Sequence, residues 1–201
     1  MQKKLLSTRN ITRIAILGAL GAVLMMIEIP LPFIAPPFYK FDLSDLPCLI
    51  GAFAMGPVPA FLIQVIKILI KLVIKPTSTA FVGELAAFIF SSTLCVGASY
   101  FYQKDRTRNG ALKGLCIASV IYVLVAAFSN FTFIIPFYVT LYKIPLEVIV
   151  GMGNSIFPFV TNKFTFVVSC VVLFNLVKVV IIDALTLVLY KHVSPLLRDR
   201  K

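Results

Sequence analysis

Nine ionisable side chains lie within or beside long apolar segments of the sequence, where a charge is costly and usually serves a function. These residues are Glu28, Asp42, Asp45, Lys67, Lys71, Glu84, Glu147, Lys178 and Asp183. Such a side chain can instead extend to a polar surface, or join an ion pair that only holds helices together. The long apolar flanks of Glu84 and Lys178 favour a functional role, whereas a structural role is favoured for Lys71 and Glu147.

Motifs of common catalytic centres are missing from the sequence. There is no GxxxxGK[ST], HExxH or GxSxG pattern, and no cluster of carboxylates resembles a two-metal site. The four cysteines form no CxxC pair and have no neighbouring histidine, so we expect reduced, buried thiols. His192 lies in a basic tail and is expected to be solvated. We therefore expect no catalytic, metal or cofactor site, which leaves binding or transport as the function.

The composition indicates an integral membrane protein. Of the 201 residues, 60% are hydrophobic and only 13% are charged, and the mean hydropathy is +0.99. A soluble domain has about a quarter of its residues charged, so a soluble enzyme is excluded. The net charge of +11 does not indicate a nucleic-acid partner, because many basic residues flank apolar runs, as expected for contact with membrane lipids.

The apolar runs predict an all-α membrane protein with one domain over residues 1–201. A spanning helix needs about 20 mostly apolar residues, and prolines and glycines divide the longer runs. The fifth helix is expected to end before Pro136, and a short partial helix is expected within residues 137–163. The six predicted helices cover about residues 11–29, 43–55, 58–74, 80–102, 111–135 and 164–190.

The distribution of basic residues predicts that both termini are cytoplasmic, because cytoplasmic loops are enriched in lysine and arginine. With the N-terminus inside, twelve Lys and Arg residues fall on the inner side. The six assigned to the outer side are Lys40, Lys67, Lys71, Lys75, Lys143 and Lys163, and Lys178 remains within a helix. The outer segments are long and rich in aromatic residues, so we expect a pocket that opens to the outside.

The first predicted helix carries a stripe of small residues. Ala15, Gly18, Ala19 and Ala22 form two overlapping registers with a spacing of four residues. Small residues at this spacing allow another helix to approach closely in lipid. The pattern is compatible both with docking of a partner protein and with packing inside the same bundle.

The sequence resembles the substrate-binding S components of energy-coupling factor (ECF) vitamin transporters, and in particular their riboflavin-specific members. The resemblance covers about residues 11–193. Its most specific part leads from the first loop into the second helix, at residues 28–33 (EIPLPF), 40–47 (KFDLSDLP) and 49–57 (LIGAFAMGP). Further matches are residues 77–80 (TSTA), 83–86 (GELA), 130–131 (NF), 136–138 (PFY) and 174–178 (FNLVK).

This resemblance implies a ligand, a site and partners. The ligand would be riboflavin, which is transported and is not a cofactor, across what is then a bacterial cell membrane. Asn130 and Lys178 would contact it directly, and Tyr39, Lys40 and Asp42 would form the rim or cap. Glu84 and Asn175 lie in matching segments and complete the expected site. The alanine stripe matches the contact with a transmembrane T component, which works with two cytoplasmic ATPase subunits.

The chemistry of riboflavin fits these side chains. The ligand has a flat, largely apolar ring system with a polar pyrimidine edge and a neutral polyhydroxyl tail. Aromatic residues in segments 30–39 and 136–142 can form the apolar walls of such a site. Asn130 can donate to and accept from an imide edge, and Lys178 can donate to a carbonyl or hydroxyl group. The sequence departs from the family pattern at Ile68, Ala87, Leu173 and Val179.

Two other functions remain open on the sequence alone. An ion-coupled secondary transporter of a small heteroaromatic metabolite would need inverted repeats and an acidic relay. The sequence shows no repeat, and Glu84 and Asp183 are few for a relay. An intramembrane enzyme of lipid or isoprenoid metabolism would need clustered acidic metal ligands, and Asp42 with Asp45 is the nearest candidate.

Overall fold

The computed structural model describes residues 7–197 of the chain, with side chains described as far as residue 189. Its elements are α1 (Thr8–Met26), β1 (Ile29–Pro30), β2 (Lys40–Phe41), α2 (Asp45–Met55), α3 (Pro57–Ile74), α4 (Val82–Lys104), α5 (Arg108–Ser129), η2 (Asn130–Ile134), α6 (Ile135–Tyr142), α7 (Leu146–Asn154), α8 (Lys163–Phe166), η3 (Val167–Val171) and α9 (Val172–Leu197). The expected all-α membrane fold is confirmed. The two-residue strands pair antiparallel and only close the first loop.

Five helical segments among the described residues are long and apolar enough to cross a membrane. They are Thr8–Met26, Pro57–Ile74, Val82–Lys104, Arg108–Tyr142 and Lys163–Leu189. The second predicted helix corresponds to α2, which has 11 residues. At about 1.5 Å per residue this helix is about 17 Å long, so it is too short to cross a hydrocarbon core of about 30 Å.

Local sequence explains where the first helices begin and end. The Ser7 side chain accepts a hydrogen bond from the backbone of Asn10 and caps the start of α1. This helix ends at Met26, three residues before the predicted end, because residues 29–30 pair with residues 40–41 as strands. Between α2 and α3, Gly56 has a φ of 105°, a conformation that favours glycine, and Pro57 then occupies the first turn of α3.

The prediction that the fifth helix ends before Pro136 is wrong. The chain continues as a helix from α5 through the π-helical turn η2 into α6, which ends at Tyr142. In η2 the backbone N–H of Ile135 donates to Asn130 five residues earlier, so the helix is widened just before the proline. Pro136 then lies in the first turn of α6, where its missing N–H is tolerated. The partial helix expected within residues 137–163 is α7.

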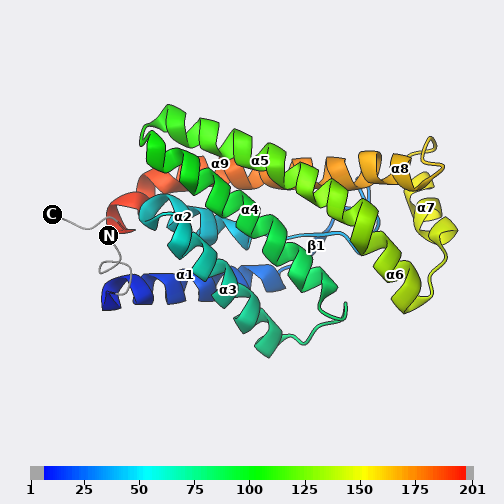
Figure 1. Cartoon of the computed structure of the whole chain (residues 1–201), viewed down its shortest axis with the longest axis horizontal. Coiled ribbons are helices and arrows are strands. Elements are labelled where there is room, and N and C mark those ends of the chain that lie inside the picture. Colours follow the sequence, from blue (N-terminus) through cyan, green and yellow to red (C-terminus); the bar gives the residue numbers. More distant parts are fainter. Residues whose placement is uncertain (1–6, 198–201) are drawn as a thin grey trace.

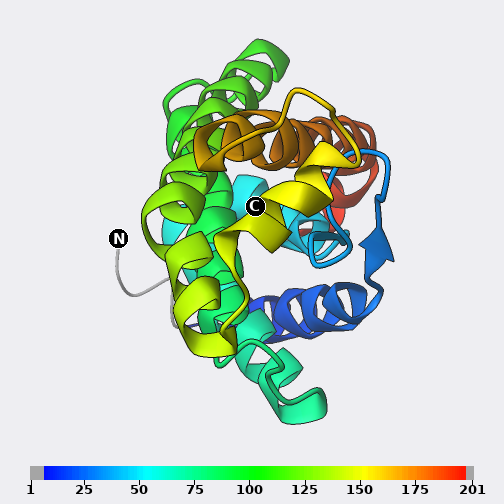
Figure 2. The same cartoon turned by 90° about the vertical axis from the view of Figure 1, so that its right-hand side faces the viewer.

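The short helix α2 lies at the centre of the bundle. It packs against α1, α3, α4 and α9, and the end-on view of Figure 2 shows it surrounded by the longer helices. Its residues Leu49 and Ala52 are fully buried in the main apolar core, together with Ile63 of α3 and Ile182 of α9. Because α2 has almost no exposed face, polar residues on it must find partners inside the protein.

A second apolar core lies at the end of the bundle that carries the strands, α6, α7 and α8 (Figure 1). Here Ala35 and Phe41 of the first loop pack with Ile149 of α7, Phe166 of α8 and Phe174 of α9. The first loop therefore fills the space between α6, α7 and α9. Residues of both segments proposed as walls of a pocket, such as Tyr39 and Val139, pack against this core.

Three segments lie together at the opposite end of the bundle (Figure 1): the first turn of α1, the last turn of α9 and the connection between α4 and α5. The expected grouping of terminal and loop segments at one end therefore matches the arrangement of the helices. Lys67 and Lys71, which were counted on the outer side, lie within α3 and are buried. Several basic residues of that count, and His192, lie outside the side chains that the structure describes: Lys3, Lys4, Lys191, Arg198, Arg200 and Lys201.

Candidate ligand-binding site

Tyr39 and Asn130, which are 91 positions apart in the sequence, meet beneath the first loop. The Tyr39 hydroxyl donates to Asn130 Oδ1 at 2.7 Å, and Asn130 Nδ2 donates to the Ala126 carbonyl oxygen at 2.8 Å. Burial raises the pKa of Tyr39, so its hydroxyl stays protonated and serves as the donor. The Tyr39 ring also packs against Phe174, with ring centroids 5.6 Å apart. The loop and the helical turn η2 are thus joined at a predicted ligand contact.

Lys178 and Asp42 form the second pair of predicted site residues. Lys178 Nζ lies 2.9 Å from Asp42 Oδ2, and both side chains are about one-tenth exposed. The other oxygen of Asp42 accepts the backbone N–H of Ser44 at 2.9 Å, which fixes the turn between β2 and α2. Asp42 therefore connects the end of the first loop to the second turn of α9.

Asn175 lies one turn before Lys178 and is anchored in the same way as Asn130. Its Nδ2 donates to the Val171 carbonyl oxygen at 2.8 Å, four residues earlier. Both asparagines adjoin a π-helical turn, Asn130 at the start of η2 and Asn175 shortly after η3. In each case the helix holds the amide nitrogen, so the carbonyl oxygen is the atom left to accept from another group. The sequence gives no signal for these π-helical turns, which often mark functional sites.

Asp45 and Lys67, two of the nine ionisable candidates, also lie near this site, although the sequence did not place them in it. Their side chains are fully buried, and Lys67 Nζ lies 2.8 Å from Asp45 Oδ1 and 3.2 Å from Ser44 Oγ. Asp45 Oδ2 lies 4.0 Å from Lys178 Nζ, so the pair adjoins the Lys178–Asp42 pair. Lysines therefore flank both carboxylates that the metal-dependent enzyme alternative required. Their apolar flanks were the available signal, but the sequence does not reveal which charges pair.

Glu84 and Lys40 make their contacts elsewhere. The Glu84 carboxylate accepts hydrogen bonds from Lys71 of α3 and, at 2.9 Å each, from the hydroxyls of Thr77 and Thr79. It therefore ties the turn between α3 and α4 to both helices. Lys40 pairs with Glu28 across the two strands. The structure thus brings Tyr39, Asp42, Asn130, Asn175 and Lys178 to one region, whereas Lys40 and Glu84 stabilise neighbouring connections.

The lysines around Glu28 predict a pH-dependent contribution to stability. Burial opposes ionisation of Glu28, but hydrogen bonds from Lys40 and Lys75 outweigh it and lower its pKa. A pKa that is lower in the folded state stabilises the fold at pH values above the unfolded pKa of about 4.3. This stabilisation is lost as the pH falls through the folded pKa. Because exposed pairs contribute about 0–1 kcal/mol, Glu28→Gln should lower the unfolding temperature by up to about 3 °C at pH 7.

Thermal unfolding in detergent at pH 7 and at pH 3 checks this prediction. The difference between the parent and Glu28→Gln should be smaller at pH 3 than at pH 7. Glu147→Gln is the control, because Glu147 is exposed and forms no ion pair among the described residues. An equal effect of both substitutions at pH 7 would contradict the role of Glu28.

Comparisons with known proteins identify the family. A family model described as "ECF transporter, substrate-specific component" matches residues 9–190, which is most of the chain. The chain belongs to the ECF-transporter S components. The resemblance inferred from the sequence is confirmed, and so is the fold that it implied.

Individual relatives of this S component are bacterial proteins of similar length. It is 26% identical over 190 residues to the riboflavin transporter RibU of Staphylococcus aureus, covering 94% of this chain and 93% of the relative. It is 20% identical over 197 residues to the riboflavin transporter FmnP of Bacillus subtilis, covering 98% and 97%. A solved structure described as the S component of a bacterial ECF transporter matches with a TM-score of 0.71 and 25% identity, covering 99% of this chain and all of that one.

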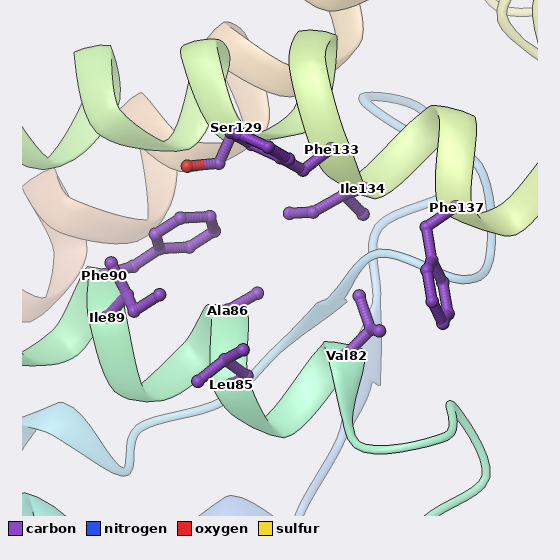
Figure 3. A pocket seen from close by; sticks show the side chains of 9 residues that line it. All are labelled: Val82, Leu85, Ala86, Ile89, Phe90, Ser129, Phe133, Ile134 and Phe137. Carbon is purple, nitrogen blue, oxygen red and sulfur yellow. The ribbon is translucent and has the colours of Figure 1, made fainter.

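An apolar pocket of about 290 Å³ opens in this S component between α4 and the continuous helix α5–η2–α6 (Figure 3). Its lining residues are Val82, Leu85, Ala86, Ile89, Phe90, Ser129, Phe133, Ile134 and Phe137. Among them Ser129 alone has a polar side chain, and Figure 3 shows it at one edge of the pocket. The predicted ligand contacts are not part of this lining. The helix around η2 therefore presents apolar residues to the pocket, while Asn130 bonds to the first loop.

The small-residue stripe on α1 of this S component divides into two registers. Gly18 and Ala22 are buried, and Gly18 lies so close to Ile66 and the Ile63 carbonyl of α3 that a Cβ atom would clash. Ala15 is exposed and Ala19 is half-buried, so this register faces away from the bundle. The stripe is therefore divided between the two roles that the sequence left open. Gly18 and Ala22 pack inside the protein, and Ala15 and Ala19 remain available to a partner.

Proposed function

We propose that this S component captures riboflavin at the end of the bundle formed by the first loop, η2 and α9. The observation that carries the proposal is similarity along nearly the whole chain to proteins named riboflavin transporters. The side-chain arrangement supports it, because an apolar core and four polar groups converge at one end of the fold. A ligand that combines an apolar ring system with hydroxyl groups needs both kinds of surface.

The polar groups have distinct parts in this proposal. Lys178 donates to a carbonyl or hydroxyl oxygen of the ligand while Asp42 keeps its charge balanced. Asn130 exchanges its bond from Tyr39 for one to the ligand, and its amide nitrogen remains fixed by α5. Tyr39 and Asp42 belong to the first loop and its junction with α2, so closing that loop over the ligand would complete the site. Asn175 offers a further acceptor one turn along α9.

We further infer the setting in which the protein works. The chain would be a multi-pass protein of a bacterial cell membrane, with both termini in the cytoplasm and the first loop outside. It carries no P-loop, so a T component and two ATPase subunits would supply the energy, and this chain would supply affinity and specificity rather than catalysis. The outward register of Ala15 and Ala19 offers the T component a surface for close approach in lipid.

The direct test is calorimetric titration of the detergent-purified chain with a panel of vitamins. Riboflavin should bind tightly at one site per chain in the absence of ATP and added metal, whereas biotin and thiamine should not bind. A yellow protein with a flavin absorption spectrum after purification would agree with this result. Tight binding of biotin or thiamine without binding of riboflavin would refute the proposed ligand.

A further inference from the structure

Four buried charges form a chain through the centre of the protein towards the proposed site. Lys67 of α3 contacts Asp45 of α2 at 2.8 Å, Asp45 lies 4.0 Å from Lys178 of α9, and Lys178 contacts Asp42 at 2.9 Å. The chain alternates in sign and contains two lysines and two aspartates. Its formal charge is therefore zero, although it comes from four different segments of the fold.

Asp45 is shared between the two lysines. Its Oδ1 bonds to Lys67, and its Oδ2 faces Lys178 but has no hydrogen-bond partner among the residues that the structure describes. Lys178 instead donates to Asp42. Asp45 thus neutralises Lys67 directly and contributes to the electrostatic environment of Lys178 without occupying its ammonium group. Lys178 keeps donors for a ligand while no excess positive charge remains around it.

Burial makes this neutrality important for the ligand. Charges interact strongly where water is excluded, and adding an unbalanced charge to such a region is costly. A hydroxyl or carbonyl oxygen can bond to Lys178 and leave the total charge of the cluster at zero. A phosphate ester adds about −1.5 to −2 charges at neutral pH and finds no uncompensated lysine in this cluster.

We propose that Asp45 is a specificity-determining residue, which keeps the charge around Lys178 balanced and so favours an uncharged ligand over its phosphate ester. The inference rests on the proposed function, in which riboflavin is the ligand near Lys178. Lysines of the first loop and its neighbours, such as Lys40 and Lys75, are exposed and are screened by solvent. Their influence is the same in every variant of the buried pair.

The test compares the dissociation constants for riboflavin and riboflavin 5′-phosphate in four forms of the full chain. Lys67→Gln gives the cluster a charge of −1, the parent has 0, and Asp45→Asn gives +1. The double variant Asp45→Asn with Lys67→Gln returns the charge to 0 and is the matched control. Asn and Gln keep polar atoms near the same positions, so the series changes charge more than shape.

The measured quantity is the ratio of the two dissociation constants, phosphorylated over unphosphorylated. At an effective dielectric constant near 20 and a separation of about 10 Å, each unit of cluster charge should change this ratio by roughly a hundredfold, because the phosphate carries about −1.5 to −2 charges. The ratio should be highest for Lys67→Gln, lowest for Asp45→Asn, and equal in the parent and the double variant. General damage to the fold weakens both ligands together and leaves the ratio unchanged.

Two results would overturn the inference while leaving the proposed function intact. One is an equal ratio in all four forms, and the other is a double variant that departs from the parent as far as Asp45→Asn does. Asp45→Asn leaves Lys67 buried without its partner and can prevent folding. In that case Lys67→Gln is compared with the double variant. The ratio of dissociation constants should be higher for Lys67→Gln, and an equal ratio would overturn the inference. A parent chain that binds no riboflavin would instead refute the proposed function.

Discussion

Replacing Ala15 or Ala19 by tryptophan is expected to abolish riboflavin uptake by cells while riboflavin binding by the purified chain is retained. Both residues lie on the outward register of α1, away from the buried Gly18 and Ala22. Helices in lipid associate through close packing of small surfaces, so a large side chain at either position should keep the T component at a distance. The proposed ligand site lies at the other end of the bundle from the first turn of α1 (Figure 1).

The experiment measures ligand binding in detergent beside uptake in whole cells. Val120→Trp on α5 is the control, because Val120 is exposed and lies on a different helix. Ala22→Trp provides the opposite comparison, since overpacking a buried position costs about 1–3 kcal/mol and should reduce expression and binding together. Unchanged uptake by Ala15→Trp and Ala19→Trp would remove this surface from the mechanism, and joint loss of binding and uptake would indicate that it packs inside the protein.

Asn130→Ala and Lys178→Ala are each expected to weaken riboflavin binding by about one to two orders of magnitude. Each substitution leaves a polar group of the ligand without its partner in a buried site, which costs about 1–3 kcal/mol. Asn130 is 2% exposed and Lys178 is 8% exposed, so water cannot easily replace the lost bond. Calorimetric titration of the purified variants measures the effect.

Two further variants separate ligand contact from support of the fold. Tyr39→Phe removes only the hydroxyl that donates to Asn130, so it should weaken binding less than Asn130→Ala. Lys178→Ala leaves Asp42 without its lysine, and adding Asp42→Asn removes that unpaired charge. The double variant should regain thermal stability without regaining affinity. Parent-like binding by folded Asn130→Ala and Lys178→Ala would refute the site assignment even if riboflavin is the ligand.

The apolar runs of the sequence were sufficient to locate the long helices, because a bilayer requires an apolar segment of a certain length. They were insufficient at Pro136, where a proline usually ends a helix. The structure accommodates it by a widened turn that starts at Asn130, which accepts a hydrogen bond from Tyr39 of the first loop. Hydropathy carries no information about such a contact.

The candidate site was harder to predict than the helices because its contacts join distant segments. Tyr39 and Asn130 were both selected from the resemblance, but nothing in their spacing indicates that they bond to each other. Lys67 was counted on the outer side and among the costly charges, but nothing in the sequence shows that it is buried against Asp45. Likewise, the faces of α1 could be separated only after α3 was seen to cover Gly18.

The continuous helix from α5 to α6 has a consequence for the surrounding bilayer. Its 35 residues extend about 50 Å, compared with a hydrocarbon thickness of about 30 Å. This excess length must be met by tilting, by bending at the widened turn η2, or by local thickening of the lipid. The stacked rings of Tyr138 and Tyr142 near its end suit the headgroup layer. Membrane thickness would therefore act on the helix that carries Asn130, so lipids of different chain length should alter the geometry at which the first loop closes.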